Sequence, residues 1–199
     1  MAITNGYATL AQVKSRLDIA DTDNDAELEN VITAVSRWID RDRRRRIYSA
    51  TETRYYTPEF SDWLIVDDIL SITTLKTDTT GDGTFDTTWE ATDYYLDAFN
   101  ENLRNLPYTQ INTTTSGDNS FTVDARRSVE IAGVFGFATT TPAEITEACI
   151  LGSMRVWKRR DILFGTVGNA DLGTVEAIAP IMKDGEFVMM LDAVPRRLL

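Results

Sequence analysis

The element that decides the fold is the stretch NDAELENVITAVSRWIDRDRRRR, residues 24–46. Its apolar side chains recur at the three- and four-residue spacing that places them on one face of a helix: Leu28, Val31, Ile32, Val35, Trp38 and Ile39. Asn24, with Glu27 three residues later, has the spacing of a capping box. We therefore predict a half-buried helix from about residue 24 to about residue 46, roughly 33 Å long.

Three further segments are predicted to be helical. Residues 9–17 begin with the capping-box spacing of Thr9 and Gln12. A second segment begins at 141–144, TPAE, which combines an N-cap threonine with proline at the first helical position, and it ends at 158–161. Small residues at 148, 149 and 152 favour close packing against the long helix. Residues 186–193 are predicted to form a last short helix.

The middle of the chain has a different character, because threonine, tyrosine and aspartate dominate in short runs that turn residues interrupt. The predicted strands are 51–57, 63–66, 71–77, 84–90, 94–98, 108–112, 121–124 and 128–135. Strands at this spacing favour an antiparallel sheet folded into a small sandwich or barrel. We therefore predict an α+β fold. Its helical bundle, made of the N-terminal helices plus the C-terminal helix, spans 1–48 and 138–199, and an antiparallel β domain is inserted at 49–137.

Composition excludes several kinds of chemistry. The chain has 199 residues, 31 acids against 20 bases, a formal charge of −11 and no histidine. Without histidine there is no Ser-His-Asp or Cys-His catalysis and no imidazole metal ligand. The single cysteine, Cys149, falls on a packed helix face and is predicted to be a small core residue. We expect a non-enzymatic protein without metal or cofactor.

Neither a membrane span nor a leader is expected. No run of 18 apolar residues occurs, and the N-terminal residues 1–5, MAITN, lack the features of a signal peptide. We therefore expect a soluble protein of a reducing compartment, with no membrane partner.

Charge is concentrated in two regions. Residues 37–46 carry six arginines and two aspartates, whereas 62–101 carry ten acids and one lysine. The arginine run is open to three interpretations: pairing with carboxylates of a neighbouring copy or partner, a solvated helix end, or phosphate binding. We favour the first, and expect that replacing residues 43–46 by glutamate blocks assembly without unfolding the chain. The candidate subunit contacts are Arg41, Arg43, Arg44, Arg45, Arg46, Arg159, Arg160, Asp67 and Asp68.

Two other features are ambiguous in the sequence. Residues 78–86, DTTGDGTFD, match the first positions of a calcium loop, but its twelfth position would be Trp89 instead of a carboxylate, so a hairpin tip is favoured. The pairs Tyr55–Tyr56 and Tyr94–Tyr95 place one ring on each side of a strand, so one ring of each pair should be exposed. Tyr55, Tyr94 and the arginines could instead serve a module that binds single-stranded nucleic acid.

Many weak motifs are spread over most of the chain: YATL at 7–10, VSRWID at 35–40, ETRYY at 52–56, LIVDDI at 64–69, SIT at 71–73, the turn at 78–86, TDYYL at 92–96, 107–108, 129–137, and WKRRD at 157–161. Their order resembles the head–tail connector family of tailed phages and related prophages, which includes head completion and adaptor proteins. The terminal Pro195, Arg196 and Arg197 resemble the family's usual ending.

This resemblance implies a structural virion protein that is made in the host cytoplasm and assembles into the neck. It implies a ring of copies, expected to be dodecameric, that lies under the portal protein and bridges it to a neck or tail completion protein. Genomic DNA would pass through the lumen without sequence recognition. The resemblance also assigns portal contact to the C-terminal residues Pro195, Arg196, Arg197, Leu198 and Leu199.

Overall fold

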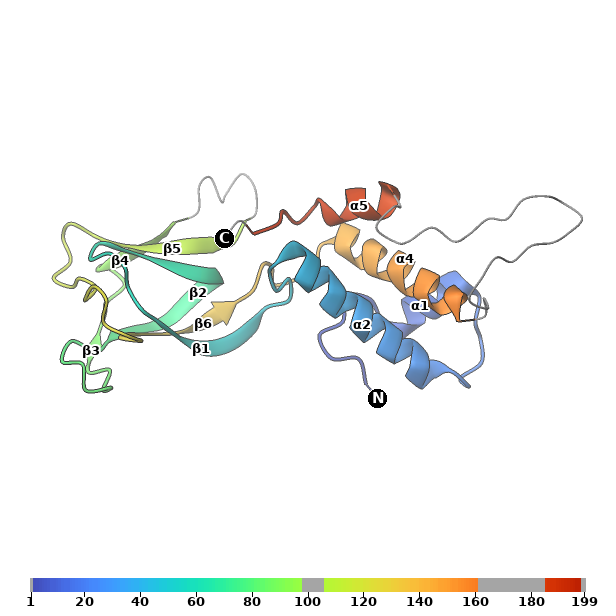
Figure 1. The fold of residues 1–199 in the computed structure, drawn as a ribbon, viewed down its shortest axis with the longest axis horizontal. Coiled ribbons are helices and arrows are strands. Elements are labelled where there is room, and N and C mark those ends of the chain that lie inside the picture. The colour runs from blue at the N-terminus through green and yellow to red at the C-terminus, as the bar shows by residue number, and fades with distance from the viewer. Residues whose placement is uncertain (1, 98–105, 161–184, 198–199) are drawn as a thin grey trace, which may run out of the picture. The chain divides into compact units, whose positions relative to one another are not determined.

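The computed structural model describes residues 2–97, 106–160 and 185–197, in which four helices and six strands occur (Figure 1). The α+β prediction is confirmed. The chain forms two compact units, a helical unit of Met1–Arg45 with Thr141–Leu199 and a β unit of Arg46–Thr140. Within the described ranges, no helix is both long and apolar enough to cross a membrane.

The helical unit contains α1 (Leu10–Leu17), α2 (Asp25–Arg43), α4 (Ala143–Arg159) and α5 (Gly185–Leu191). The capping box of α1 is confirmed, since the Gln12 amide donates to Thr9 Oγ1 (3.2 Å) and the Thr9 amide donates to Gln12 Oε1 (2.8 Å). Two cap predictions are wrong in detail. Asn24 is the N-cap of α2 without a side-chain cap bond, and Pro142 occupies the N-cap position of α4 that was predicted for Thr141.

Helix α2 ends at Arg43, three residues before the predicted end. Arg44 adopts a left-handed backbone conformation with φ of 54°, and its amide donates to the carbonyl of Arg41 (3.3 Å). This geometry terminates a helix, because the chain turns away from the helical path. The last arginines of the run therefore lie in a turn and do not continue the helix.

The core of the helical unit is built where the periodicity predicted it. Residues Leu28, Ile32, Val35 and Ile39 on α2 are buried, and so are Ile145, Ala148 and Cys149 on α4. Helices α2 and α4 lie side by side (Figure 1). Ser36 Oγ on α2 lies 3.4 Å from Cys149 Sγ on α4, which confirms the close approach predicted from the small residues.

The β unit is one antiparallel sheet with the strand order β1-β6-β2-β5-β4, and β3 also pairs with β2. The strands are β1 (Ala50–Tyr56), β2 (Trp63–Thr77), β3 (Thr87–Thr88), β4 (Tyr94–Asp97), β5 (Tyr108–Thr113) and β6 (Val129–Phe135). The predicted antiparallel sheet is confirmed, and no pairing among the described strands joins β1 to β4 to close it into a barrel.

Strand β2 is the main departure from prediction, because one strand of 15 residues replaces the two predicted at 63–66 and 71–77. Its first half pairs with β5 and its second half pairs with β6, with register shifts on both sides of Ile69. Of the other predicted strands, 84–90 shrinks to β3 and 121–124 contains no strand.

One apolar cluster forms the core of the β unit: Leu64, Val66, Ile69, Leu75, Trp89, Ile111, Phe121, Val129, Ile131 and Phe135. Tyr56 and Tyr94 pack against this cluster, whereas Tyr55 and Tyr95 are exposed. The prediction of one exposed ring in each pair is therefore confirmed. At Gly133 on β6, a Cβ atom would lie 2.2 Å from the Ser71 carbonyl oxygen of β2, so the two backbones approach closely there.

Candidate interaction surfaces

The predicted arginine run at the end of α2 does not act as a single group. Arg43 is the buried member, with a side chain only 5% exposed. Its Nη1 donates to the Leu191 carbonyl (3.2 Å), the Val194 carbonyl (3.4 Å) and Asp192 Oδ1 (3.1 Å), while its Nε donates to Asp42 Oδ2 (2.8 Å). The Leu191 carbonyl also accepts from the Val194 amide (3.1 Å), so Arg43 adds a second donor there and is the donor to the Val194 carbonyl just beyond α5.

The C-terminal segment lies against the same end of α2. The Arg197 amide donates to the Arg43 carbonyl (3.0 Å), Arg196 forms an ion pair with Asp42, and Val194 is fully buried. Three of the candidate portal contacts, Pro195, Arg196 and Arg197, thus belong to a segment bound to its own chain. Leu198 and Leu199 lie outside the described residues.

Arg41 and Arg44 are exposed, and no ion pair involves them within the described ranges. Arg45 is half-buried. Arg46 belongs to the β unit, where it pairs with Glu52, donates to the Phe135 carbonyl (2.8 Å) and stacks over the Tyr48 ring. The hydrogen bond from Arg46 lowers the pKa of Glu52.

The other predicted cations lie at the end of α4. Arg160 stacks over the Trp157 ring, 3.6 Å from its centroid, and pairs with Glu27 near the start of α2 (3.6 Å). The C-terminal end of α4 therefore lies beside the N-terminal end of α2, and the two helices are antiparallel. Arg159 is also exposed.

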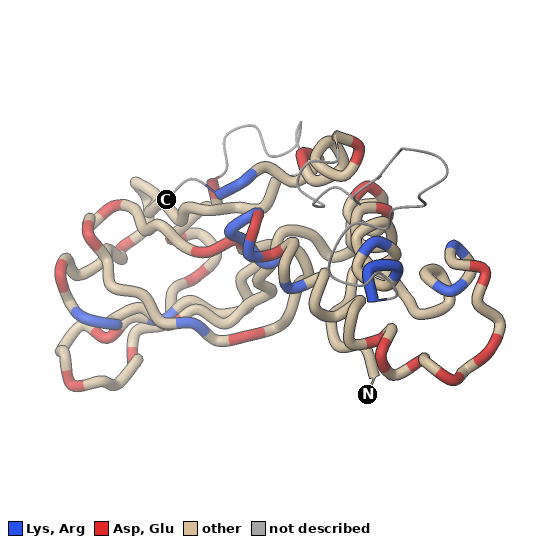
Figure 2. Tube along the Cα trace, turned by 45° about the vertical axis from the view of Figure 1, so that its right-hand side comes forward, with Lys and Arg blue, Asp and Glu red and all other residues tan. Residues whose placement is uncertain are grey.

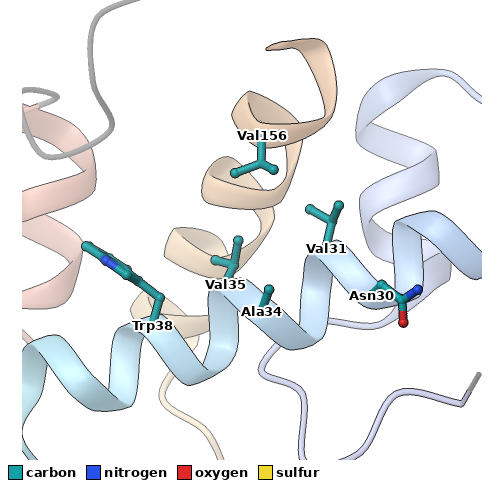
Figure 3. Close-up of a pocket in the computed structure, with 6 residues that line it drawn as sticks. All are labelled: Asn30, Val31, Ala34, Val35, Trp38 and Val156. Atoms are coloured by element: carbon teal, nitrogen blue, oxygen red, sulfur yellow. The ribbon is translucent and has the colours of Figure 1, made fainter. Parts of the chain in front are cut away.

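Between α2 and α4 lies an apolar groove with a volume of about 450 Å³, lined by Asn30, Val31, Ala34, Val35, Trp38 and Val156. Figure 3 shows Val31, Val35 and Val156 pointing into the space between the helices, while Trp38 extends towards α5. Val156 is 44% exposed although it is apolar. Sequence reasoning missed this groove, because it assigned the whole apolar face of α2 to internal packing.

The predicted acidic contacts lie in the β unit, where Figure 2 shows acidic positions spread over the strands and loops. Asp67 accepts from Arg54 Nη1 (2.8 Å) and from the Tyr56 hydroxyl (3.3 Å). Burial, together with the charge of Asp67, raises the pKa of Tyr56 to about 12. Asp68 is buried. Asp68 is therefore part of the packing of its own unit, whereas the Asp67 side chain pairs with Arg54 and stays 46% exposed.

The turn after β2 is organised by one carboxylate. Asp78 Oδ1 accepts from the amides of Thr80 (3.0 Å) and Gly81 (2.7 Å), and Oδ2 accepts from the Gly83 amide (2.8 Å). These hydrogen bonds, the one from Gly83 above all, lower the pKa of Asp78. The turn joins β2 to β3, which confirms the hairpin interpretation.

The described residues contain no cluster of three or more acidic, cysteine or histidine side chains arranged to hold a metal ion. Cys149 is fully buried against Ser36, and burial raises the pKa of its thiol. It is the core residue that its position predicted. The described surface has an apolar groove and the exposed arginines Arg41, Arg44 and Arg159. Both features are suited to contacts with other proteins.

No family model and no curated protein matches the chain. The solved structures that share its fold include two from gene transfer agent particles. One is a chain in the neck of an empty gene transfer agent particle computed with C6 symmetry, with a TM-score of 0.61 and 16% identity. The other is a chain in the virion of a native gene transfer agent particle, with a TM-score of 0.58 and 14% identity. Each comparison covers 100% of this chain and 95% of the other chain. At these identities, the likeness is one of fold.

Proposed function

We propose that this chain is a non-enzymatic structural subunit of a phage-type particle neck. In this proposal, copies of it form a ring that lies under a portal protein, bridges the portal to a neck or tail completion protein and lets genomic DNA pass. The observation that carries the proposal is the fold shared, over the whole chain, with a chain in a gene transfer agent neck. The C6 symmetry of that neck is compatible with six or twelve copies, and twelve is the number that we propose.

The charge of the chain supports a passage for DNA. Each copy has a formal net charge of −11, so the protein as a whole repels a DNA duplex. Basic walls bind DNA because they release its counterions, and a lumen formed by this protein lacks that contribution. The same charge makes neighbouring copies repel one another. Because exposed ion pairs contribute only about 0–1 kcal/mol each, apolar area must supply most of the association.

The outward arginines are the residues that we assign to contacts between proteins. Arg41 and Arg44 are exposed at the end of α2, and Arg159 is exposed at the end of α4. Arg43 and Arg46 are occupied by hydrogen bonds inside their own units, so their contribution to assembly is indirect. We assign portal contact to the C-terminal segment 195–199, whose described part lies on the end of α2.

Co-expression with the portal protein encoded in the same genome tests the proposal. We expect the chain to co-purify with the portal and to form rings visible by electron microscopy. The double variant Arg41→Glu/Arg44→Glu should lose rings, and removal of 195–199 should weaken portal binding, while circular dichroism stays unchanged. The matched control is Arg126→Glu/Arg127→Glu, which reverses two exposed charges in the β unit. A wild-type chain that neither co-purifies with the portal nor forms rings would overturn the proposal.

The rival function, single-stranded nucleic-acid binding, requires exposed aromatic rings near arginines. Tyr94 packs against the core of the β unit, which leaves Tyr55 alone of the two proposed stacking rings. A mobility shift with oligonucleotides that weakens as salt rises would favour this rival.

A further inference from the structure

We propose that the apolar groove between α2 and α4 receives the exposed side of α5 from a second copy of this chain. This inference rests on the proposed ring and names the surfaces that would join its subunits. It begins from two apolar features that the described residues of the helical unit leave uncovered, the groove and the side chain of Met189.

Among the described residues, helix α5 packs through one side. Phe187 and Leu191 are fully buried, and the Phe187 ring lies 5.5 Å from the Trp38 ring of α2. Met189 follows Phe187 by two residues, which turns it by about 200° around the helix axis. It therefore points away from α2, and it is 69% exposed, the most exposed of the large apolar side chains in the described residues.

The groove has the complementary character. It is concave and lined almost entirely by apolar side chains, and Val31, Val35 and Val156 converge in it (Figure 3). Its volume of about 450 Å³ exceeds that of one methionine side chain, so it can also accept the neighbouring half-buried Val188 of α5. Methionine suits such a contact, because its flexible thioether adapts to irregular apolar surfaces.

Acids beside Met189 face arginines beside the groove. Arg41 lies one helical turn beyond Trp38 on α2, and Arg159 lies one turn beyond Val156 on α4. Glu27, one turn before Val31, is the acid on the groove side and already pairs with Arg160 of its own chain. Glu186 and Asp192 lie three residues before and after Met189, and the Asp192 side chain is 70% exposed although it also accepts from Arg43. The acids of α5 therefore complement Arg41 and Arg159.

The two surfaces differ from each other, and Met189 points away from the helix that lines the groove. A contact between different patches is heterologous, and repetition of it produces a ring when the rotation closes. A twofold dimer can use the same two surfaces only reciprocally, with α5 of each copy in the groove of the other. The proposed ring requires the head-to-tail arrangement, in which each copy offers its groove to one neighbour and its α5 to the other.

Cysteine cross-linking tests the pairing. In a Cys149→Ala background, Ala34→Cys is placed on one full-length chain and Met189→Cys on another chain with a different affinity tag. A short bis-maleimide reagent should give mixed dimers only when both chains are present. Tyr95→Cys, exposed on the β unit, replaces Met189→Cys in the matched control. The absence of mixed dimers, or equal cross-linking of Ala34→Cys chains to one another, would overturn the pairing. A chain that carries both Ala34→Cys and Met189→Cys should give cross-linked trimers and larger oligomers, and cross-linked dimers alone would overturn the head-to-tail arrangement.

A second variant tests the apolar contact without cross-linking. Met189→Asp should weaken self-association, measured by light scattering, by about tenfold or more, because burial of a methionine side chain contributes about 1.5–3 kcal/mol. The fold should remain intact, since the side chain is exposed. An unchanged association would overturn the inference. If the chain binds the portal but gives no mixed dimers, the proposed function stands and this inference fails. If the chain gives mixed dimers but does not bind the portal, this inference stands and the proposed function fails.

Discussion

Substitution of Arg43 by methionine should destabilise the helical unit strongly, and the size of the effect can be worked out from its contacts. Nη1 is a hydrogen-bond partner of the Leu191 and Val194 carbonyls, and Leu191 and Val194 are fully buried. A buried polar group left without a partner costs about 1–3 kcal/mol. Removal of one member of a buried ion pair costs about 3–5 kcal/mol. Since Asp42 keeps its ion pair with Arg196, we expect the free energy of unfolding to fall by about 3 kcal/mol, the lower end of that range.

The assay is urea denaturation of the full chain, combined with hydrogen exchange measured by mass spectrometry so that α2 and α5 are followed separately from the β unit. The neighbouring substitution Arg44→Met is the matched control. Arg44 is exposed and has no ion pair within the described ranges, so its loss should change the free energy of unfolding by less than about 0.5 kcal/mol. Equal effects of the two substitutions would refute the assignment of Arg43 as the residue that holds α5.

Two further predictions concern the β unit. Gly133→Ala should lower the free energy of unfolding by about 2 kcal/mol, because its Cβ would collide with the Ser71 carbonyl of β2. The control is Gly185→Ala, which has open space around the added Cβ and should cause no loss. Thermal unfolding of the two variants measures both effects. The pKa of Asp78 is lowered in the folded chain, so its carboxylate stabilises the fold above the unfolded pKa, and this contribution is lost as the pH falls. Asp78→Asn should therefore be less stable than the wild type near neutral pH. The difference should begin to shrink below about pH 4 and be lost as the pH falls through the lowered pKa of the folded chain; a difference that stays constant through this range would contradict this account.

Periodic elements could be predicted from the sequence, because the side chains that define them are local. The apolar spacing of α2 and the alternation of β6 needed no knowledge of distant residues. The break predicted within β2 was wrong for a non-local reason. Asp67 and Asp68 lie in the gap between the two predicted strands, and acids are depleted in strands. In the folded chain, Arg54 neutralises Asp67 and Asp68 is buried, so the strand continues through both acids.

The interaction surfaces were predictable only in part. The sequence places five arginines in six positions, but the partners of Arg43 are carbonyls 148 and 151 residues away. No local pattern separates it from Arg44. The groove was missed because an apolar stripe indicates burial without indicating how many elements cover it. Ala34 and Val156 lie on sides of their helices that the described elements leave open.

Arg43 is buried and Arg44 is exposed, and this difference between adjacent arginines matters for mutational scanning. A block replacement of 43–46 by glutamate combines a structural lesion at Arg43 with a change of surface charge at Arg44. If such a variant fails to assemble, the failure alone does not show whether the subunit lost exposed arginines that bind a neighbour or lost the Arg43 contacts that hold its own C-terminal segment. Only single-position scanning, paired with a measurement on the isolated subunit, separates the two causes.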